Sequence, residues 1–236
     1  MNEEKEIKIR ILDKINLNEL KKIIENIFEI KFKKIKKDRD VYFDLNDNYY
    51  FRLNHGLRIR NNEELAYKAL FYIPERMKNP WFVLEKEYKL PLSKECLLIL
   101  FKIANIKCNI NLKNKIDNNE LKNILQKLNF FEHIKINKVR HIAKNENYEM
   151  CIDFVEDLGL FIEIETNEDG YLNYLRKKIP FKYKEIRHGY TNLYAKEVMK
   201  MDIPNFKEKF LSNPEWNFLS GQKEIVKEII KNNKQL

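Results

Sequence analysis

Charged side chains recur along this chain at a spacing of two residues, and this spacing is its first indication of chemistry. Near the N-terminus, Glu4, Glu6 and Lys8 occupy alternate positions. Towards the other end, Glu163 and Glu165 alternate with isoleucines. Residues two apart on a β-strand share a face, so each group would place its charges on one side of a strand. For a single strand, the ordinary explanation is a half-exposed antiparallel strand with its polar face in water.

The same arrangement returns in other segments of the chain. The further charged residues are Arg58 with Arg60, Glu85 with Glu87, Lys138 with Arg140, and Asp153. The strands predicted around them are strongly apolar, which favours an apolar face covered by helices and a charged face turned inward. Inward charges are costly unless they are paired, hydrated or bound to a ligand. A closed antiparallel barrel of about eight strands encloses room for one small ligand. Such an interior would suit a polyanion held with a divalent metal.

In their order, these residues resemble the CYTH family, the triphosphate tunnel enzymes. This family includes class IV adenylyl cyclases, thiamine triphosphatases and inorganic tripolyphosphatases. The resemblance covers about residues 3–195 and rests on these blocks: Glu4-x-Glu6-x-Lys8, Tyr42-Phe43-Asp44, Gly56 to Arg60 with Lys68, Glu85-x-Glu87, Lys138-x-Arg140, Asp153 with Leu158 to Glu165, and Gly189-Tyr190-x-x-Leu193. The fold it implies is α+β, a closed antiparallel eight-stranded β-barrel, or tunnel, with helices packed on its outside.

The chain also departs from the family pattern. Val83 stands where the family often has a basic residue, and Ala66 stands where a threonine is common. A long insertion separates Glu87 from Lys138. These departures leave the fold expectation in place and leave the identity of the substrate open.

The resemblance implies a role for each group of charged residues. Hard oxygen ligands select Mg²⁺ or Mn²⁺, and the expected metal ligands are Glu4, Glu6, Glu163 and Glu165. The alternative is that these carboxylates pair with basic side chains. Arginine offers a two-pronged fork to phosphate and lysine a point charge, and the residues expected to hold the triphosphate are Arg58, Arg60, Lys68, Lys138 and Arg140. Lys8 would contact a phosphate or adjust the pKa of a carboxylate. Asp153, Glu85 and Glu87 would bind a second metal or position the nucleophile.

Two reactions fit this set of residues, and the sequence leaves both open. In a cyclase, the ribose 3′ oxygen of ATP attacks the α-phosphorus and pyrophosphate leaves. In a triphosphatase, water attacks the terminal phosphorus. The blocks at 42–44 and 158–165 look most like the cyclase branch, so an adenylyl cyclase is favoured over a tripolyphosphatase or a nucleoside or thiamine triphosphatase. A non-catalytic nucleic-acid-binding protein is the alternative from another class, based on the basic segments at 31–37 and 49–52. The acidic pairs argue against it.

Composition limits these expectations. The net charge of +9 favours an anionic partner such as ATP or another triphosphate. Three cysteines without paired spacing, and no apolar run of membrane length, lead us to expect a cytoplasmic protein without a membrane partner. The four histidines lack the spacing of zinc ligands, which argues against a zinc site. With only five glycines, the sequence has no glycine-rich phosphate-binding loop. A homodimer is compatible with the sequence.

Apolar periodicity predicts helices at 18–30, 93–106, 117–128, 171–178 and 223–231. Ser93 and Asp117 are expected to cap the second and third of these helices. We expect a triphosphate-binding domain at 1–200, with a helical insertion at about 92–134, and a helical extension at 201–236. The insertion and the extension are expected to cover the barrel exterior or a partner surface and to supply no essential catalytic group. The apolar residues expected to be buried in the insertion are Leu97, Leu98, Phe101, Leu121, Ile124 and Leu125.

Overall fold

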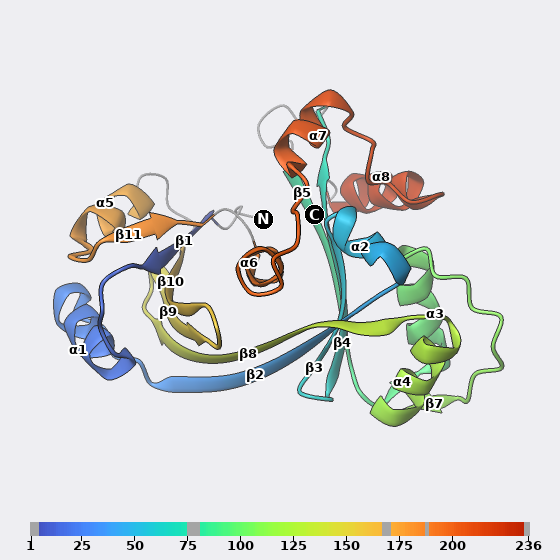
Figure 1. The fold of residues 1–236 in the computed structure, drawn as a ribbon, viewed down its shortest axis with the longest axis horizontal. Helices are drawn as coiled ribbons and strands as arrows, with labels where there is room; N and C mark the ends of the chain where they lie inside the picture. The colour runs from blue at the N-terminus through green and yellow to red at the C-terminus, as the bar shows by residue number, and fades with distance from the viewer. Residues whose placement is uncertain (1–4, 75–80, 167–170, 187–188, 234–236) are drawn as a thin grey trace. The chain divides into compact units, whose positions relative to one another are not determined.

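A computed structural model describes residues 5–74, 81–166, 171–186 and 189–233 (Figure 1). The chain divides into two compact units, here called unit 1 (residues 1–39 and 136–202) and unit 2 (residues 40–135 and 203–236). The strands are β1 Lys5–Ile11, β2 Lys34–Asp44, β3 His55–Arg60, β4 Glu64–Tyr72, β5 Trp81–Lys89, β6 Leu92–Ser93, β7 Lys115–Ile116, β8 Phe131–Lys144, β9 Tyr148–Val155, β10 Gly159–Thr166 and β11 Tyr183–Glu185. The helices are α1 Leu17–Phe28, α2 Tyr49–Arg52, α3 Lys94–Ile103, α4 Asn118–Lys127, α5 Tyr171–Lys178, α6 Tyr190–Glu197, α7 Phe206–Ser212 and α8 Gln222–Asn233, with a 3₁₀ turn at Asn46–Asn48.

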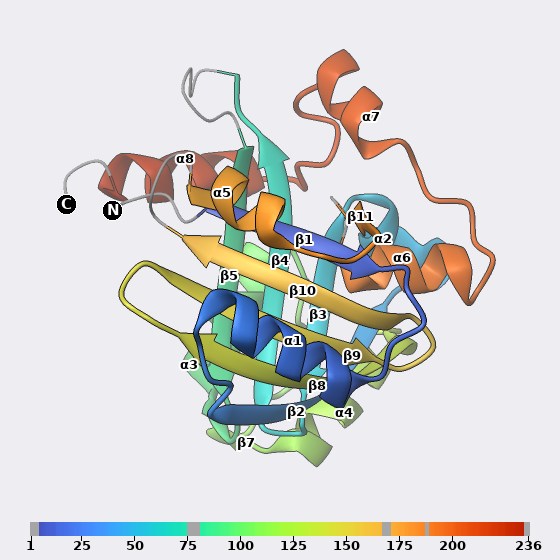
Figure 2. The same cartoon turned by 90° about the vertical axis from the view of Figure 1, so that its left-hand side faces the viewer.

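The sheet of unit 1 has an apolar face covered by helix α1. The strands follow the order β11-β1-β10-β9-β8, and the register of each described pair is antiparallel. Ile7 and Ile9 of β1 share one core with Leu20 and Ile24 of α1, and Figure 2 shows this helix lying in front of the strands. Leu175 and Ile179, in and just after α5, join the same core. The predicted helix at 18–30 and the covered apolar face are therefore confirmed.

The opposite face of these strands carries the charges, as the alternation requires. Lys8 lies between the buried Ile7 and Ile9, and Glu163 lies between the buried Ile162 and Ile164. Helix α6 adjoins this second face, because the ring of Tyr190 meets Phe161 of β10 edge-on at 5.0 Å. The charged face is thus partly covered by a helix of its own unit.

Unit 2 builds its sheet from β3, β4 and β5 together with the second part of β2. Asn61 and Asn62 have positive φ in the turn that joins β3 to β4, a backbone conformation that asparagine tolerates better than most residues. Ser93 accepts a hydrogen bond from the backbone N–H of Cys96, and Asp117 accepts one from that of Glu120. Both predicted helix caps are confirmed.

The insertion and the tail pack into the core of unit 2. Five of the six residues expected in the insertion's apolar stripe are buried, whereas Leu98 is 40% exposed. In the tail, Val226 and Leu219 join the same core. The side-chain amide of the buried Asn217 donates to the carbonyls of Leu53 and Leu70. The tail is therefore an integral part of unit 2.

The prediction of a closed eight-stranded barrel is wrong, because the sheet is not closed. The main sheet has nine strands in the order β11-β1-β10-β9-β8-β2-β3-β4-β5, and its two end strands, β11 and β5, are not paired with each other in the described part of the chain. The physical reason is that each unit buries its apolar faces in a core of its own. The α+β class with a large antiparallel sheet and external helices holds. No helix among the described residues is both long and apolar enough to span a membrane.

Candidate functional site

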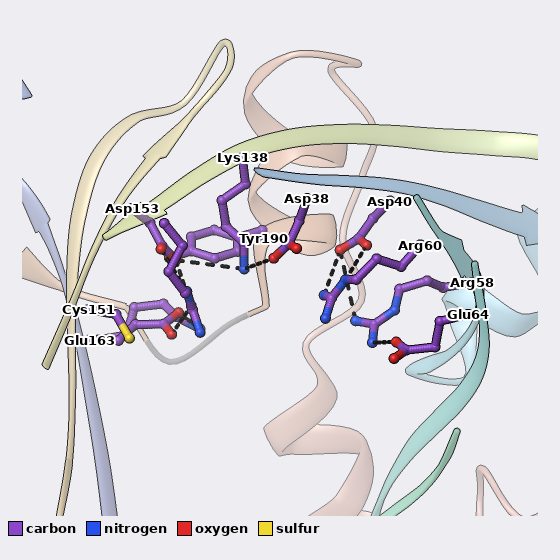
Figure 3. Close-up of polar contacts among 12 residues, drawn as sticks. Asp38, Asp40, Arg58, Arg60, Glu64, Lys138, Cys151, Asp153, Glu163 and Tyr190 are labelled. Carbon is purple, nitrogen blue, oxygen red and sulfur yellow. Dashed lines mark hydrogen bonds and ion pairs between the residues drawn. The ribbon is translucent and has the colours of Figure 1, made fainter. Parts of the chain in front are cut away.

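Unit 1 brings six of its charged side chains together on the face opposite α1. This unit 1 group consists of Lys8, Asp38, Lys138, Arg140, Asp153 and Glu163. The register places Lys8 directly opposite Glu163, and Arg140 directly opposite Asp153. Asp38 comes from the first part of β2. Alternation along neighbouring strands gathers these residues, and Figure 3 labels four of them, Asp38, Lys138, Asp153 and Glu163.

Every cation of the unit 1 group is held by a carboxylate. Nζ of Lys8 lies 3.0 Å from Glu163, and Arg140 also contacts Glu163. Arg140 donates through Nε and Nη2 to the two oxygens of Asp153, at 2.7 and 2.6 Å. Lys138 lies 3.5 Å from Asp38 and 3.8 Å from Asp153. Asp153 is fully buried and Glu163 nearly so, so these are charge-assisted contacts shielded from water.

The charges set the protonation of the group. Burial alone would raise the pKa of Glu163, but Lys8 and Arg140 outweigh it and hold that pKa well below its usual range. Burial would lower the pKa of Lys8, but Glu163 and Glu6 raise it. Burial raises the pKa of the Cys151 thiol to about 12. Lys8, Arg140 and Glu163 therefore stay ionised at neutral pH, beside an unreactive thiol.

Tyr190 of α6 lies within the unit 1 group. Its hydroxyl donates to Asp153 at 2.8 Å. The ammonium groups of Lys8 and Lys138 lie 4.7 and 5.6 Å from the centre of its ring, which is the arrangement of a cation–π contact. Burial, with Glu163 and Asp153 nearby, raises the pKa of Tyr190 and keeps its proton in place. A second tie to α6 comes from Arg10, which pairs with Glu197 at 2.6 Å.

The expected metal ligands fit a hard divalent cation in chemical type. Glu6 lies directly opposite Glu165, and Glu163 lies two residues from Glu165, so three carboxylates share one face of β1 and β10. Glu4 lies outside the described residues. The described part of the chain holds no cluster of three or more potential ligands close enough to bind a metal together. Glu6 and Glu163 instead contact Lys8, at 3.4 and 3.0 Å.

Unit 2 has a charged group of a similar kind. This unit 2 group consists of Asp40, Arg58, Arg60, Glu64 and Glu87. Asp40 accepts from Nε and Nη2 of Arg60, at 2.7 and 3.0 Å. Arg58 lies 3.8 Å from Asp40, 3.4 Å from Glu64 and 2.9 Å from Glu87. The buried Leu57 and Ile59 alternate with the two arginines, which fixes the arginines on the other face of β3.

Lys68 and Glu85 lie opposite each other on β4 and β5 and pair at 2.8 Å. Both side chains are more exposed than the arginines, since Lys68 is 58% exposed and Arg58 only 12%. Burial, together with Glu64 and Glu85, raises the pKa of Glu87. Glu87 thus takes up a proton more readily than an ordinary glutamate.

Sequence reasoning missed Asp38, Asp40 and Glu64 of these groups, as well as Tyr190, which contacts the unit 1 group. Asp38 and Asp40 are two apart on β2, the same signal that singled out the glutamate pairs, but they stand in a lysine-rich segment that reads as a basic stretch. Tyr190 was part of a family block without a role. The block residue Asp44 has a structural role instead, because it accepts the backbone N–H groups of Leu45, Tyr50 and Phe51.

Comparison with known proteins gives a consistent picture. A Methanocaldococcus jannaschii protein provisionally named adenylate cyclase is 32% identical over 166 residues, which span 70% of this chain and 77% of that protein. Protein PH1819 of Pyrococcus horikoshii has a similar solved structure, with a TM-score of 0.52, 22% identity, and coverage of 82% of this chain and 99% of that one.

A Hippeastrum protein is a second similar structure, with a TM-score of 0.51, 16% identity, and coverage of 84% of this chain and 97% of that one. Its structure is described as that of a candidate adenylyl cyclase with a dominant triphosphatase activity. At these identities, the two structures establish similarity of fold. The CYTH domain family itself matches residues 2–180, and the chain therefore belongs to the CYTH domain family.

Proposed function

We propose that this protein is a divalent-metal-dependent enzyme that acts on a triphosphate. The observation that carries the proposal is the pair of arginine-centred groups on strand faces, each with its cations oriented by carboxylates. Guanidinium groups oriented in this way offer two-pronged donors to phosphate oxygens. The proposed phosphate ligands are Arg58, Arg60, Lys68, Lys138 and Arg140.

The residues of the chain would act by positioning and by neutralising charge, as phosphoryl transfer generally requires. Lys8 would contact a phosphate oxygen from the face of β1. Asp153 is fully buried and accepts from Arg140 and Tyr190, so its proposed role is to orient those side chains. Glu87 is the group proposed to accept the proton of the nucleophile, because it is partly exposed and its pKa is raised. Glu85 would support it.

The proposed metal ligands are Glu4, Glu6, Glu163 and Glu165, binding Mg²⁺ or Mn²⁺. When bound, the metal would neutralise phosphate charge and assist the leaving group. Lys8 and Arg140 form ion pairs with Glu163. Phosphate oxygens of a bound substrate would replace Glu163 as the partner of both cations and leave its carboxylate able to bind the metal.

The reaction we propose is conversion of ATP to cyclic AMP and pyrophosphate. The name of the 32% identical relative supports it. Hydrolysis of a triphosphate is the second candidate, supported by the activity described for the Hippeastrum structure. The same phosphate ligands would serve both reactions, and the difference would lie in which phosphorus faces the nucleophile.

One assay tests the proposal and separates the candidates. The purified chain is incubated with ATP or with tripolyphosphate, each with Mg²⁺ or Mn²⁺, and cyclic AMP is resolved from free phosphate. Cyclic AMP above the level of an Arg58→Ala, Arg140→Ala double variant supports the cyclase. Free phosphate without cyclic AMP supports the hydrolase. Neither product above that control, with both metals, would refute an enzyme of this class.

A further inference from the structure

The carboxylates of the unit 2 group differ in how they hold their arginines. Asp40 is only 5% exposed and engages Arg60 through both of its oxygens, at 2.7 and 3.0 Å. It also lies 3.8 Å from Arg58. A planar carboxylate that meets Nε and Nη2 together fixes the plane of the guanidinium. Asp40 therefore determines the direction in which Arg60 presents its fork.

Glu64 and Glu87 hold Arg58 in a looser way. Each contacts Nη2 of Arg58 through a single oxygen, at 3.4 and 2.9 Å. Their side chains are 25% and 43% exposed, so water can replace either of them. Exposed single-oxygen pairs contribute little free energy, because solvent screens them and side-chain entropy opposes them.

We infer that Asp40 is a positioning residue that keeps Arg60 and Arg58 aimed at the triphosphate, and that Glu64 is an exchangeable counter-ion that a phosphate displaces. This inference rests on the proposed function. An arriving phosphate would compete with Glu64 for Arg58, since both offer oxygen acceptors to the same nitrogen. Asp40 would stay in place, because leaving would abandon a buried carboxylate without its partner.

Charge repulsion by Asp40 and orientation of Arg60 by Asp40 predict opposite effects of Asp40→Asn on the affinity for an anion. If Asp40 acted only through its charge, Asp40→Asn would remove a repulsion and tighten the binding of an anion. If it orients Arg60, the same variant would weaken binding, because an amide presents one oxygen and one N–H₂ group to the guanidinium where the carboxylate presents two acceptor oxygens. Glu64→Gln provides the matched control, since it removes the same charge from the same group without removing a two-pronged contact.

The test is titration calorimetry of the full chain with the non-hydrolysable bis-methylene analogue of tripolyphosphate in the presence of Mg²⁺. We expect Asp40→Asn to weaken binding by about tenfold and Glu64→Gln to tighten it by about two- to fivefold. In an Arg60→Ala background, Asp40→Asn should lose most of its effect, which loss of fold stability alone would not produce. Tighter binding by Asp40→Asn would overturn the inference and leave the proposed function standing. No binding by the native chain would overturn both.

A second variant covers the case in which Asp40→Asn does not fold, as judged by the loss of a cooperative urea transition. Arg60→Lys keeps the positive charge of Arg60 but cannot make a two-pronged contact with Asp40. We expect it to bind the analogue about tenfold more weakly than the native chain. Native affinity in Arg60→Lys would show that orientation by Asp40 is irrelevant and would overturn the inference.

Discussion

Glu163→Gln removes one negative charge from the centre of the unit 1 group and tests the metal assignment directly. The native carboxylate is 5% exposed and contacts Lys8 at 3.0 Å as well as Arg140. The glutamine side chain has the same shape, can accept through one oxygen, and presents an N–H₂ group where the cations expect an acceptor. The change is therefore electrostatic and not steric.

The loss of stability in Glu163→Gln depends on the carboxylate partners that Lys8 and Arg140 retain. Breaking a buried ion pair costs about 3–5 kcal/mol when it leaves a charge without a partner. Here Lys8 keeps Glu6 at 3.4 Å, and Arg140 keeps both oxygens of Asp153. Neither cation is abandoned, so the loss should be that of hydrogen bonds to a charged group, about 2 kcal/mol. Divalent-dependent turnover, by contrast, should be abolished.

Two measurements check these expectations. Urea unfolding followed by circular dichroism gives the free energy of unfolding of the whole chain, whereas tryptophan fluorescence would sample unit 2 alone, because both tryptophans belong to it. Turnover is then measured across a Mg²⁺ titration. Glu185→Gln is the matched control, since its pair with Arg176 at 2.9 Å is exposed on both sides and should contribute less than about 1 kcal/mol. Native turnover with an unchanged Mg²⁺ titration in Glu163→Gln would refute the assignment of Glu163 as a metal ligand, and a stability loss above about 4 kcal/mol would refute the claim that its cations keep their partners.

Three further predictions concern other parts of the chain. Arg58→Ala should weaken triphosphate binding by about 1.5–3 kcal/mol, measured by calorimetry, and millimolar triphosphate with metal should raise the melting temperature of the native chain but not that of Arg58→Ala. Burial lowers the pKa of His55 to about 3, so below about pH 6.5 the native state binds fewer protons than the unfolded state. The free energy of unfolding should therefore decrease as the pH is lowered from about 6.5 towards 3, by at most about 1.4 kcal/mol per pH unit. His55→Asn should reduce the slope of unfolding free energy against pH, and an identical slope would contradict this cause. Asn217→Ala should cost about 1–3 kcal/mol by leaving the carbonyls of Leu53 and Leu70 without their donor, while turnover per folded molecule stays native.

The elements of the fold that depend on neighbouring residues were predictable from the sequence. Alternation at Ile7, Lys8 and Ile9 fixed both the strand and its two faces, because side chains of a strand alternate strictly. Caps such as Ser93 and Asp117 act within three residues of their own position, so local sequence contains the whole signal. The burial of Leu98 was predicted wrongly, since a helical stripe tells which residues are apolar but not how wide the covering surface is.

Features that depend on distant partners were only partly predictable. The family resemblance gathered the charged blocks, yet it gave no indication that Asp38 and Asp40 would hold the proposed phosphate ligands. Their partners lie on β3 and β8, and only the register of the folded strands shows the pairing. Closure of the sheet depends on edge strands that are far apart in the chain, so the charge pattern could not decide it.

The composition of unit 1 from two distant segments has a consequence for how the chain folds during synthesis. Strand β1 pairs with β10, and Glu6 lies opposite Glu165, so the first strand leaves the ribosome long before its partner. Until then, Ile7, Ile9 and Ile11 have no sheet to complete and remain available to other chains. Contacts this distant in sequence slow folding, because the chain must lose the entropy of closing a long loop before the stabilising contacts can form. We therefore expect unit 1 to fold only after β10 has been synthesised, and its nascent first strand to be the segment of the chain that most needs a chaperone.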